Sequence, residues 1–254
     1  MASIPYQEIV SSDSFKFLVG SEKKPYFLHS ALVADQSRAL NALVNSGMRE
    51  SKERCAVWEH IDEQTFLRFS QFAYTGDYTG AAPSEDKVER RNLSSARILP
   101  IPDPKVYGNV RTSSIWTNFV LLFPDTGLHL RRNGATDDYS EVFLSHARMY
   151  FFAEYYAIAK LQSLALQKLH RALVLFTPYR ERIGDILKLI RYCYEDRALR
   201  ESESHIDVKF IVSMYTAVRI EDLWQSEEFQ SIVETIGDYS KGLVHAMLMR
   251  LAPV

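Results

Sequence analysis

Cysteine is scarce in this chain, and its scarcity excludes two kinds of site. The 254 residues contain only two cysteines, Cys55 and Cys193, which lie far apart in sequence. Such a pair cannot form a Cys-x-x-Cys metal or redox site, and it suits a reducing compartment better than a disulfide framework. We therefore expect a cytoplasmic or nuclear protein.

Long apolar runs and a targeting pattern are also missing. The first residues, MASIPYQEIVSSDSF, contain no basic region followed by an apolar core, so no secretory signal is expected. The nearest candidate for a membrane span, IWTNFVLLF, is interrupted by Thr117 and Asn118. It is also much shorter than the roughly 18 apolar residues that a span needs. The sequence predicts a soluble protein without a membrane partner.

Positive charge is not in surplus. The chain has 30 lysines and arginines against 32 acidic residues, and its net charge is -2. Proteins that bind a nucleic acid duplex usually carry a basic surplus or stripe. We expect no nucleic acid partner.

The sequence motifs of catalysis and cofactor binding are absent too. There is no Gly-x-x-x-x-Gly-Lys loop, no Gly-x-Gly-x-x-Gly turn, no His-Glu-x-x-His helix and no Gly-x-Ser-x-Gly elbow. Among the seven dispersed histidines, His146 and His170 are too far apart to chelate a metal from one helical face. We expect no enzyme, cofactor, metal or small-molecule substrate. The distant alternative is an unrecognised hydrolase with a triad built from separated residues.

The first part of the chain has the pattern of a small sheet followed by helices. Two aromatic segments, 15–19 and 26–28, are separated by the turn GSEKKP, which predicts a hairpin. Apolar residues then recur at helical intervals, and Ser37 is placed to start a second short helix. CAVWEH predicts a third strand, and a helix should run from Asp62 to a stop at Gly76.

Residues 79–138 interrupt this pattern with polar, proline-rich sequence, which predicts a largely disordered insertion. Within it, residues 114–124 (SIWTNFVLLFP) could be an added strand or a short motif that folds on a partner. RRNLSS places two arginines before Ser94 and Ser95, a pattern that basophilic kinases prefer, so both serines are possible phosphorylation sites. The alternative is a solvated linker; phosphate there would add charge where structure is weak.

Helical periodicity returns at 141 and continues to the end of the chain. Abundant tyrosine and phenylalanine, 14 of each, are expected to fill the cores between helices. The predicted helical segments are EVFLSHARMYFFAEYYAIAKLQSLALQKLHRALVLF, IGDILKLIRYCYED, DVKFIVSMYTAV and EEFQSIVETIGDYSKGLVHAML.

Four pieces of sequence, in this order, resemble the BTB/POZ family. They are an acidic residue with a strand (Asp13, FKFLV), then YFLHSALVADQS, then FAYTGDY, and last a helix with Tyr150, Ala153 and Tyr156 at the family's spacing. The resemblance implies an α+β fold, a small sheet flanked by helices, and the insertion is similar to that of fungal members. It divides the chain into an N-terminal tail (1–12), the first part of the BTB/POZ domain (13–78), the insertion (79–138), the last helices of the domain (139–176) and an all-α extension (177–254).

The resemblance implies a protein that binds other proteins. In one use of the fold, the domain docks on the N-terminal part of a cullin and serves as substrate adaptor of a cullin-RING ubiquitin ligase. Such adaptors carry a hydrophobic-x-Glu element, which Met48, Arg49 and Glu50 match, and Tyr156 matches a tyrosine that borders the same surface. A methionine offers an adaptable apolar plug, and a carboxylate adds orientation. The alternative for Met48–Glu50 is an exposed loop before the third strand.

In the second use, the domain forms a homodimer and acts as a scaffold or transcriptional co-regulator. The resemblance places Asp13 in the dimer pocket, but the residue after the histidine, which is basic in such dimers, is Ser30 here. His29 lies at a strand-to-helix junction, where a polar side chain can help to satisfy backbone donors, so we expect it to be structural. No zinc-finger or other DNA-reading motif supports direct gene regulation.

Overall fold

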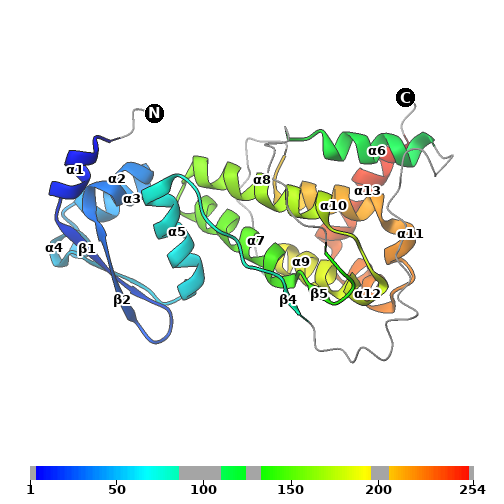
Figure 1. Ribbon diagram of the computed structural model, residues 1–254, viewed down its shortest axis with the longest axis horizontal. Coiled ribbons are helices and arrows are strands. Elements are labelled where there is room, and N and C mark those ends of the chain that lie inside the picture. Colours follow the sequence, from blue (N-terminus) through cyan, green and yellow to red (C-terminus); the bar gives the residue numbers. More distant parts are fainter. Residues whose placement is uncertain (1–3, 86–109, 124–132, 196–205, 252–254) are drawn as a thin grey trace. The chain divides into compact units, whose positions relative to one another are not determined.

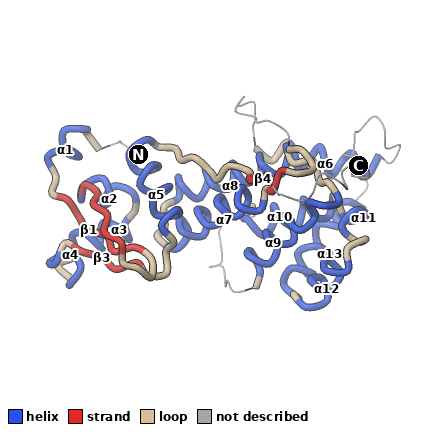
Figure 2. Tube along the Cα trace, turned by 60° about the horizontal axis from the view of Figure 1, so that its bottom comes forward, coloured by secondary structure: helices blue, strands red, loops and turns tan. Residues whose placement is uncertain are grey.

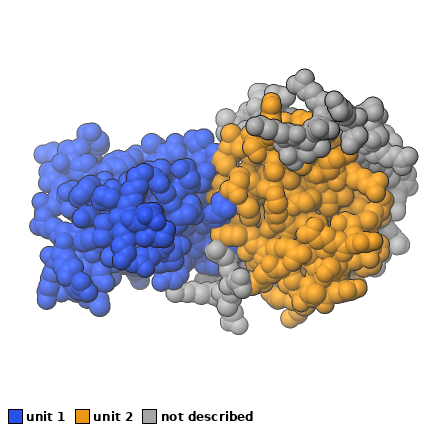
Figure 3. All heavy atoms as spheres, turned by 90° about the horizontal axis from the view of Figure 1, so that it is seen from below, with its two compact units in different colours: residues 1–80, 148–165 blue, residues 81–147, 166–254 orange. Residues whose placement is uncertain are grey.

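The structure is a computed structural model that describes residues 4–85, 110–123, 133–195 and 206–251. The chain is mixed α+β and mostly helical, as expected (Figure 1). It divides into two compact units, coloured in Figure 3. Unit 1 contains Met1–Gly80 and Arg148–Ala165, and unit 2 contains Ala81–Ala147 and Leu166–Val254. The domain boundaries given by the resemblance stay a prediction.

Unit 1 combines one sheet with helices from two parts of the chain. Helices α7 and α8 contribute their residues 148–155 and 159–165 to it. Its elements are α1 (Tyr6–Ser11), β1 (Ser14–Val19), β2 (Lys24–His29), α2 (Ser30–Gln36), α3 (Arg38–Asn45), α4 (Arg49–Glu53), β3 (Cys55–Trp58), α5 (Glu63–Thr75) and these parts of α7 (Ser140–Tyr155) and α8 (Ala159–Leu175).

The sheet of unit 1, whose strands are red in Figure 2, has the strand order β2-β1-β3. The predicted hairpin is confirmed: β1 and β2 are antiparallel, with Phe17 opposite Tyr26. Strand β3 lies parallel to β1, with Leu18 opposite Val57. A parallel neighbour requires a crossover connection, and α2, α3 and α4 provide it. The predicted third strand is therefore also confirmed.

The predicted helix signals of unit 1 are confirmed by their hydrogen bonds. The Ser37 hydroxyl accepts from the Leu40 backbone N–H at 3.1 Å and so caps α3. Asp62 accepts from the Thr65 N–H at 2.9 Å and caps α5. Gly76 ends α5 with a left-handed φ of 76°, a conformation that glycine adopts without steric cost.

Aromatic side chains fill the core of unit 1, as expected from their abundance. The ring of Trp58 lies 4.6 Å from Phe17 and 4.5 Å from Tyr156, measured between centroids. Phe69 of α5 contacts Phe152 of α7 at 4.9 Å. Residues far apart in sequence thus share one core, which joins the end of α7 to the sheet.

In its described residues, unit 2 consists of helices and turns with one short ladder, in which β4 pairs antiparallel with β5. The predicted helical segments after residue 141 are confirmed where the structure describes them, and EEFQSIVETIGDYSKGLVHAML is broken into two helices at Ile236. The further elements of unit 2 are β4 (Ser84–Glu85), α6 (Val110–Val120), β5 (Asp137–Asp138), a 3-10 turn (Arg180–Arg182), α9 (Ile183–Tyr194), α10 (Val208–Val218), α11 (Ile220–Leu223), α12 (Glu227–Thr235) and α13 (Gly237–Leu251).

Helix α6 rules out the first of the two alternatives for residues 114–124, an added strand. Ile115 and Phe119 are four residues apart and both buried, so they form the core-facing side of a helix. The Nε2–H of His170 donates to the carbonyl of Phe119 at 2.6 Å, and the guanidinium of Arg219 lies 5.7 Å from the Trp116 ring. The structure thus packs this part of the insertion within unit 2. A short apolar run does not distinguish strand from helix by periodicity alone.

Two segments contain short helices that the sequence analysis did not name. Residues 1–12, the expected tail, include helix α1, none of whose side chains is buried. Met48–Glu50, for which an exposed loop was the alternative, lead into helix α4. No helix within the described residues is long and apolar enough to span a bilayer.

Candidate interaction surface

Met48 and Glu50 lie at the exposed start of α4. Helix α3 ends at Asn45, and the chain turns through Gly47, whose φ is 75°. Two hydrogen bonds between residues close in sequence stabilise the turn. The Met48 N–H donates to the Ser46 hydroxyl, and the Gly47 N–H donates to the Ser51 hydroxyl, both at 3.3 Å. The Met48 side chain is 67% exposed, so the turn presents a thioether to solvent.

The charges around Met48 leave one carboxylate available. Arg49 and Glu53 form an ion pair at 2.8 Å across one helical turn. Glu50 is half-buried, and within the described residues it forms no ion pair or side-chain hydrogen bond. An exposed apolar side chain beside an unpaired carboxylate can bind a protein groove that has a cation at its rim.

Tyr156 packs in the core of unit 1. Its ring is 8% exposed and stacks on Trp58, the last residue of β3, at 4.5 Å with an interplanar angle of 30°. Burial raises the pKa of its hydroxyl above the usual range. Its expected place at the border of the Met48 surface stays a prediction.

Its neighbour Tyr155 is the exposed tyrosine of this segment, and the sequence analysis missed it. Its ring is 60% exposed and makes an edge contact with His60 at 5.9 Å. Tyr155 ends α7 and Tyr156 follows the helix; Tyr155 is exposed to solvent, whereas Tyr156 is buried. The apolar pattern around the pair was the available signal.

Asp13, the predicted dimer-pocket residue, has a partner within its own chain. Its carboxylate lies 2.8 Å from the guanidinium of Arg54, and both side chains are mostly exposed. Arg54 occupies the left-handed position at the end of α4 with a φ of 49°. The sequence analysis looked for this cation at Ser30, because it considered only the position after the histidine. An exposed pair of this kind contributes about 0–1 kcal/mol.

His29 occupies the junction that the sequence analysis assigned to it. It ends β2 and stands at the N-cap of α2, but its side chain makes no capping hydrogen bond there. Instead its Nδ1 lies 2.8 Å from the hydroxyl of Tyr74 on α5. The histidine therefore ties the strand to a helix, which is a structural role.

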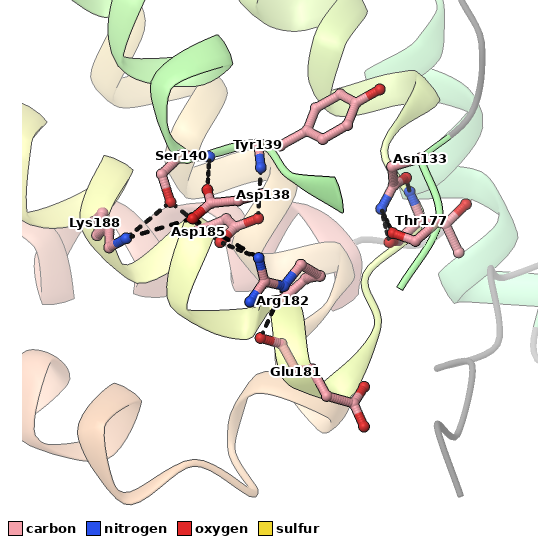
Figure 4. A network of polar contacts seen from close by, with 10 residues as sticks. Asn133, Asp138, Tyr139, Ser140, Thr177, Glu181, Arg182, Asp185 and Lys188 are labelled. Atoms are coloured by element: carbon pink, nitrogen blue, oxygen red, sulfur yellow. Dashed lines mark hydrogen bonds and ion pairs between the residues drawn. The ribbon is translucent and has the colours of Figure 1, made fainter. Parts of the chain in front are cut away.

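A polar cluster in unit 2 brings several ionisable groups together (Figure 4). The Ser140 hydroxyl donates to Asp185 and accepts from the Lys188 ammonium, both at 3.1 Å. The Tyr139 N–H donates to Asp185 at 2.9 Å, and the Arg182 guanidinium lies 3.8 Å from Asp138. Burial raises the pKa of Asp185, although the hydrogen bond from Tyr139 opposes that rise.

This cluster holds the chain before α7 onto α9. The Ser140 hydroxyl contacts both a lysine and a carboxylate, groups that can activate a nucleophile, but Ser140 is only 4% exposed and its hydroxyl already donates to Asp185 and accepts from Lys188. A substrate atom must reach hydrogen-bond distance of such a group. Beside it, Asn133 brackets Thr177 with two backbone hydrogen bonds of 2.8 and 2.6 Å, a second tie of the same kind (Figure 4).

The described residues contain no group of three or more His, Cys, Asp or Glu side chains placed to hold a metal ion. Ser94 and Ser95, the predicted phosphorylation sites, lie outside the part of the chain that the structure describes. No family model matches the sequence, and no curated protein matches it.

Proposed function

We propose that this protein is a protein-interaction module of the BTB/POZ type and that it acts as a substrate adaptor for a cullin-RING ubiquitin ligase. The arrangement of unit 1 supports the proposal. A hairpin is followed by a helical crossover into a parallel strand, then by α5 and later by the tyrosine-containing end of α7. This is the order of elements that the sequence resemblance implies.

The observation that carries the proposal is the exposure of Met48 beside Glu50. A methionine that is 67% exposed gains little from water, whereas its flexible thioether fits an apolar groove well. Because α4 is only five residues long, the turn at Ser46 and Gly47 rather than packing fixes its start. Met48 and Glu50 thus lie together at the start of this short helix.

A BTB-mediated homodimeric scaffold or co-regulator is the second candidate. It is favoured by helix α1, where Tyr6 is 77% and Val10 is 48% exposed, one helical turn apart. Such a pair forms an apolar stripe that a second subunit could cover. The pairing of Asp13 with Arg54 in one chain weighs against a dimer held by Asp13.

Calorimetric titration with a cullin N-terminal domain tests the adaptor function. We expect binding in the micromolar range or tighter for the wild-type chain. Met48→Ala and Glu50→Ala should each weaken it by about 2 kcal/mol, roughly thirty-fold, if both act as anchoring contacts. Met249→Ala and Glu234→Ala, which change an exposed methionine and an exposed glutamate of unit 2, are the matched controls.

Absence of binding by the wild-type chain removes the adaptor function. Binding that Met48→Ala and Glu50→Ala leave unchanged places the cullin contact elsewhere and removes this surface. Sedimentation equilibrium of the same samples, with Tyr6→Ala and Val10→Ala as variants, measures the homodimer directly. A monomer at all concentrations removes the second candidate.

A further inference from the structure

The three-stranded sheet of unit 1 has two edges, and within the described residues no further strand pairs with the outer side of β3. The N–H groups of Lys16 and Gly20 on β1 donate to the carbonyls of Arg54 and Trp58 at 2.9 and 3.1 Å. Because backbone groups alternate in direction along a strand, those of Cys55 and Val57 point away from β1. Within the described residues, no hydrogen bond reaches the N–H or C=O of either residue.

The edge at β2 is blocked by comparison. The outward positions of β2 are Pro25, Phe27 and His29, because β1 directs the backbone groups of Phe15, Phe17 and Val19 toward their register partners Leu28, Tyr26 and Lys24. Pro25 has no N–H to donate. The N–H of His29 donates to the hydroxyl of Tyr74 at 3.4 Å. Proline and covering side chains are the means by which sheets prevent strand addition at an edge, and β3 has neither on its outward side.

The side chains next to the open edge indicate what chemistry would fit it. On the outer face of the sheet, Val57 is 51% exposed and stands beside Leu18, which is half-buried. The next position along the same face holds Cys55 and Lys16. Within the described residues, Lys16 forms no ion pair. An incoming strand would therefore meet an apolar position and, two residues away, an uncompensated positive charge.

We propose that the open edge of β3 binds an extended peptide segment of another protein, which adds a fourth strand to the sheet. Cys55 and Val57 supply its backbone hydrogen bonds, an apolar residue covers Val57 and Leu18, and an acidic residue two positions along faces Lys16. Main-chain bonds supply affinity in this mode of recognition, and alternate side chains supply specificity. This site is separate from Met48 and Glu50 and goes beyond the proposed adaptor function.

A second copy of the chain is a poorer occupant of this edge. A second copy would offer the same four-residue strand, which is preceded by Arg54 in the left-handed conformation, so two β3 strands could form few hydrogen bonds with each other. Only residues 55–58 are extended, because α4 ends at Glu53. Charge complementarity to Lys16 instead favours an acidic peptide.

Backbone amide exchange on the full chain, measured residue by residue, tests the proposal. The probe is a nine-residue blocked peptide in which threonine alternates with valine and one central aspartate; a second peptide has lysine in place of the aspartate. In the free protein, the amides of Cys55 and Val57 should exchange rapidly, while those of Ala56 and Trp58 are protected. The aspartate peptide should slow exchange at Cys55 and Val57 at least tenfold.

Two substitutions separate the parts of the proposal. Val57→Pro removes an outward N–H without removing a bond to β1, and it should lower affinity for the peptide at least tenfold. Phe27→Pro, the same change at an outward position of β2, is its control and should leave binding intact. Lys16→Glu should reverse the preference, so that the lysine peptide binds more tightly than the aspartate peptide. Protection of Ala56 and Trp58 reports that each variant keeps its sheet.

Three results would overturn the proposal. The first is slow exchange of Cys55 and Val57 in the free dilute protein, which means that the edge is already covered. The second is unchanged exchange of Cys55 and Val57 at 1 mM of the aspartate peptide. The third is slowing that depends on protein concentration alone, which assigns the edge to a second copy. Val57→Pro should not alter the cullin titration, and Met48→Ala should not alter peptide binding, so the two proposals fail independently.

Discussion

Replacing Phe119 by alanine should detach helix α6 from unit 2. Phe119 is fully buried, and its ring lies 4.8 Å from His170 and 5.9 Å from Tyr215. Ile115 is the other buried side chain of the described part of α6. The substitution therefore removes the larger of the two apolar side chains that α6 places in the core.

The size of the effect follows from what α6 can do alone. Truncating a buried phenylalanine to alanine typically costs 3–5 kcal/mol, the sum of lost transfer energy and a cavity. An isolated helix of eleven residues is marginal in water. If the lost stabilisation exceeds the free energy that holds α6 on unit 2, the helix detaches. The rest of unit 2 is then destabilised by no more than that free energy. We expect protection of the α6 amides to fall by roughly a hundredfold or more, since about 3 kcal/mol corresponds to that factor.

Amide exchange within α6 and urea unfolding of the full chain are the two assays. Leu121→Ala is the control, because Leu121 follows the helix directly and is 72% exposed. Phe119→Ala should lower protection of α6 far more than it lowers protection of α5 in unit 1. If Phe119→Ala and Leu121→Ala give the same exchange rates throughout α6, Phe119 does not anchor the helix and the reasoning is wrong.

Two smaller predictions concern a helix cap and a buried histidine. Asp62→Ala removes the cap of α5 and should destabilise unit 1 by about 1 kcal/mol in urea unfolding. Asp35→Ala, which changes an exposed residue of α2, is the control and should cost less than about 0.5 kcal/mol. Equal unfolding midpoints for the two variants would contradict the capping role. Burial lowers the pKa of His170 below its unfolded value of about 6.5, although the hydrogen bond to Phe119 opposes the shift. As the pH falls, the unfolded chain is therefore protonated at His170 before the folded chain is. Stability of unit 2 should therefore decrease from pH 7.5 to pH 5.5, and His170→Gln should show a smaller decrease; an identical decrease in both proteins would exclude His170 as a cause.

Local signals in the sequence were reliable where the chemistry that they encode is itself local. Ser37 and Asp62 predict helix starts because a side-chain oxygen reaches a backbone N–H three residues away. Gly76 predicts a stop because its φ is positive. Helix α6 was not predictable in this way. Its helical face is defined by His170 and Tyr215, which lie on other helices and are distant in sequence.

The interaction surface was predictable only in part, for the same reason. The exposure of Met48 follows from a turn built of adjacent residues, Ser46 and Gly47, which the sequence displays. The burial of Tyr156 depends on Trp58, and the pairing of Asp13 depends on Arg54. Both partners are tens of residues away, at opposite ends of β3. A sequence motif can identify candidate residues, but whether they form one surface depends on where the folded chain places them.

The insertion is therefore better understood as a part of unit 2 than as a loop added to unit 1. On its N-terminal side, the N–H of Ala81 donates to the Ser145 hydroxyl at 3.1 Å. Near its C-terminal side, Asn133 holds Thr177 from both directions, and in between Phe119 covers His170. Each of these contacts joins the described part of the insertion to another part of unit 2 by a hydrogen bond. Removing residues 110–123 would expose His170 and Tyr215 to water, so the helices after residue 166 and the described part of the insertion stabilise one another.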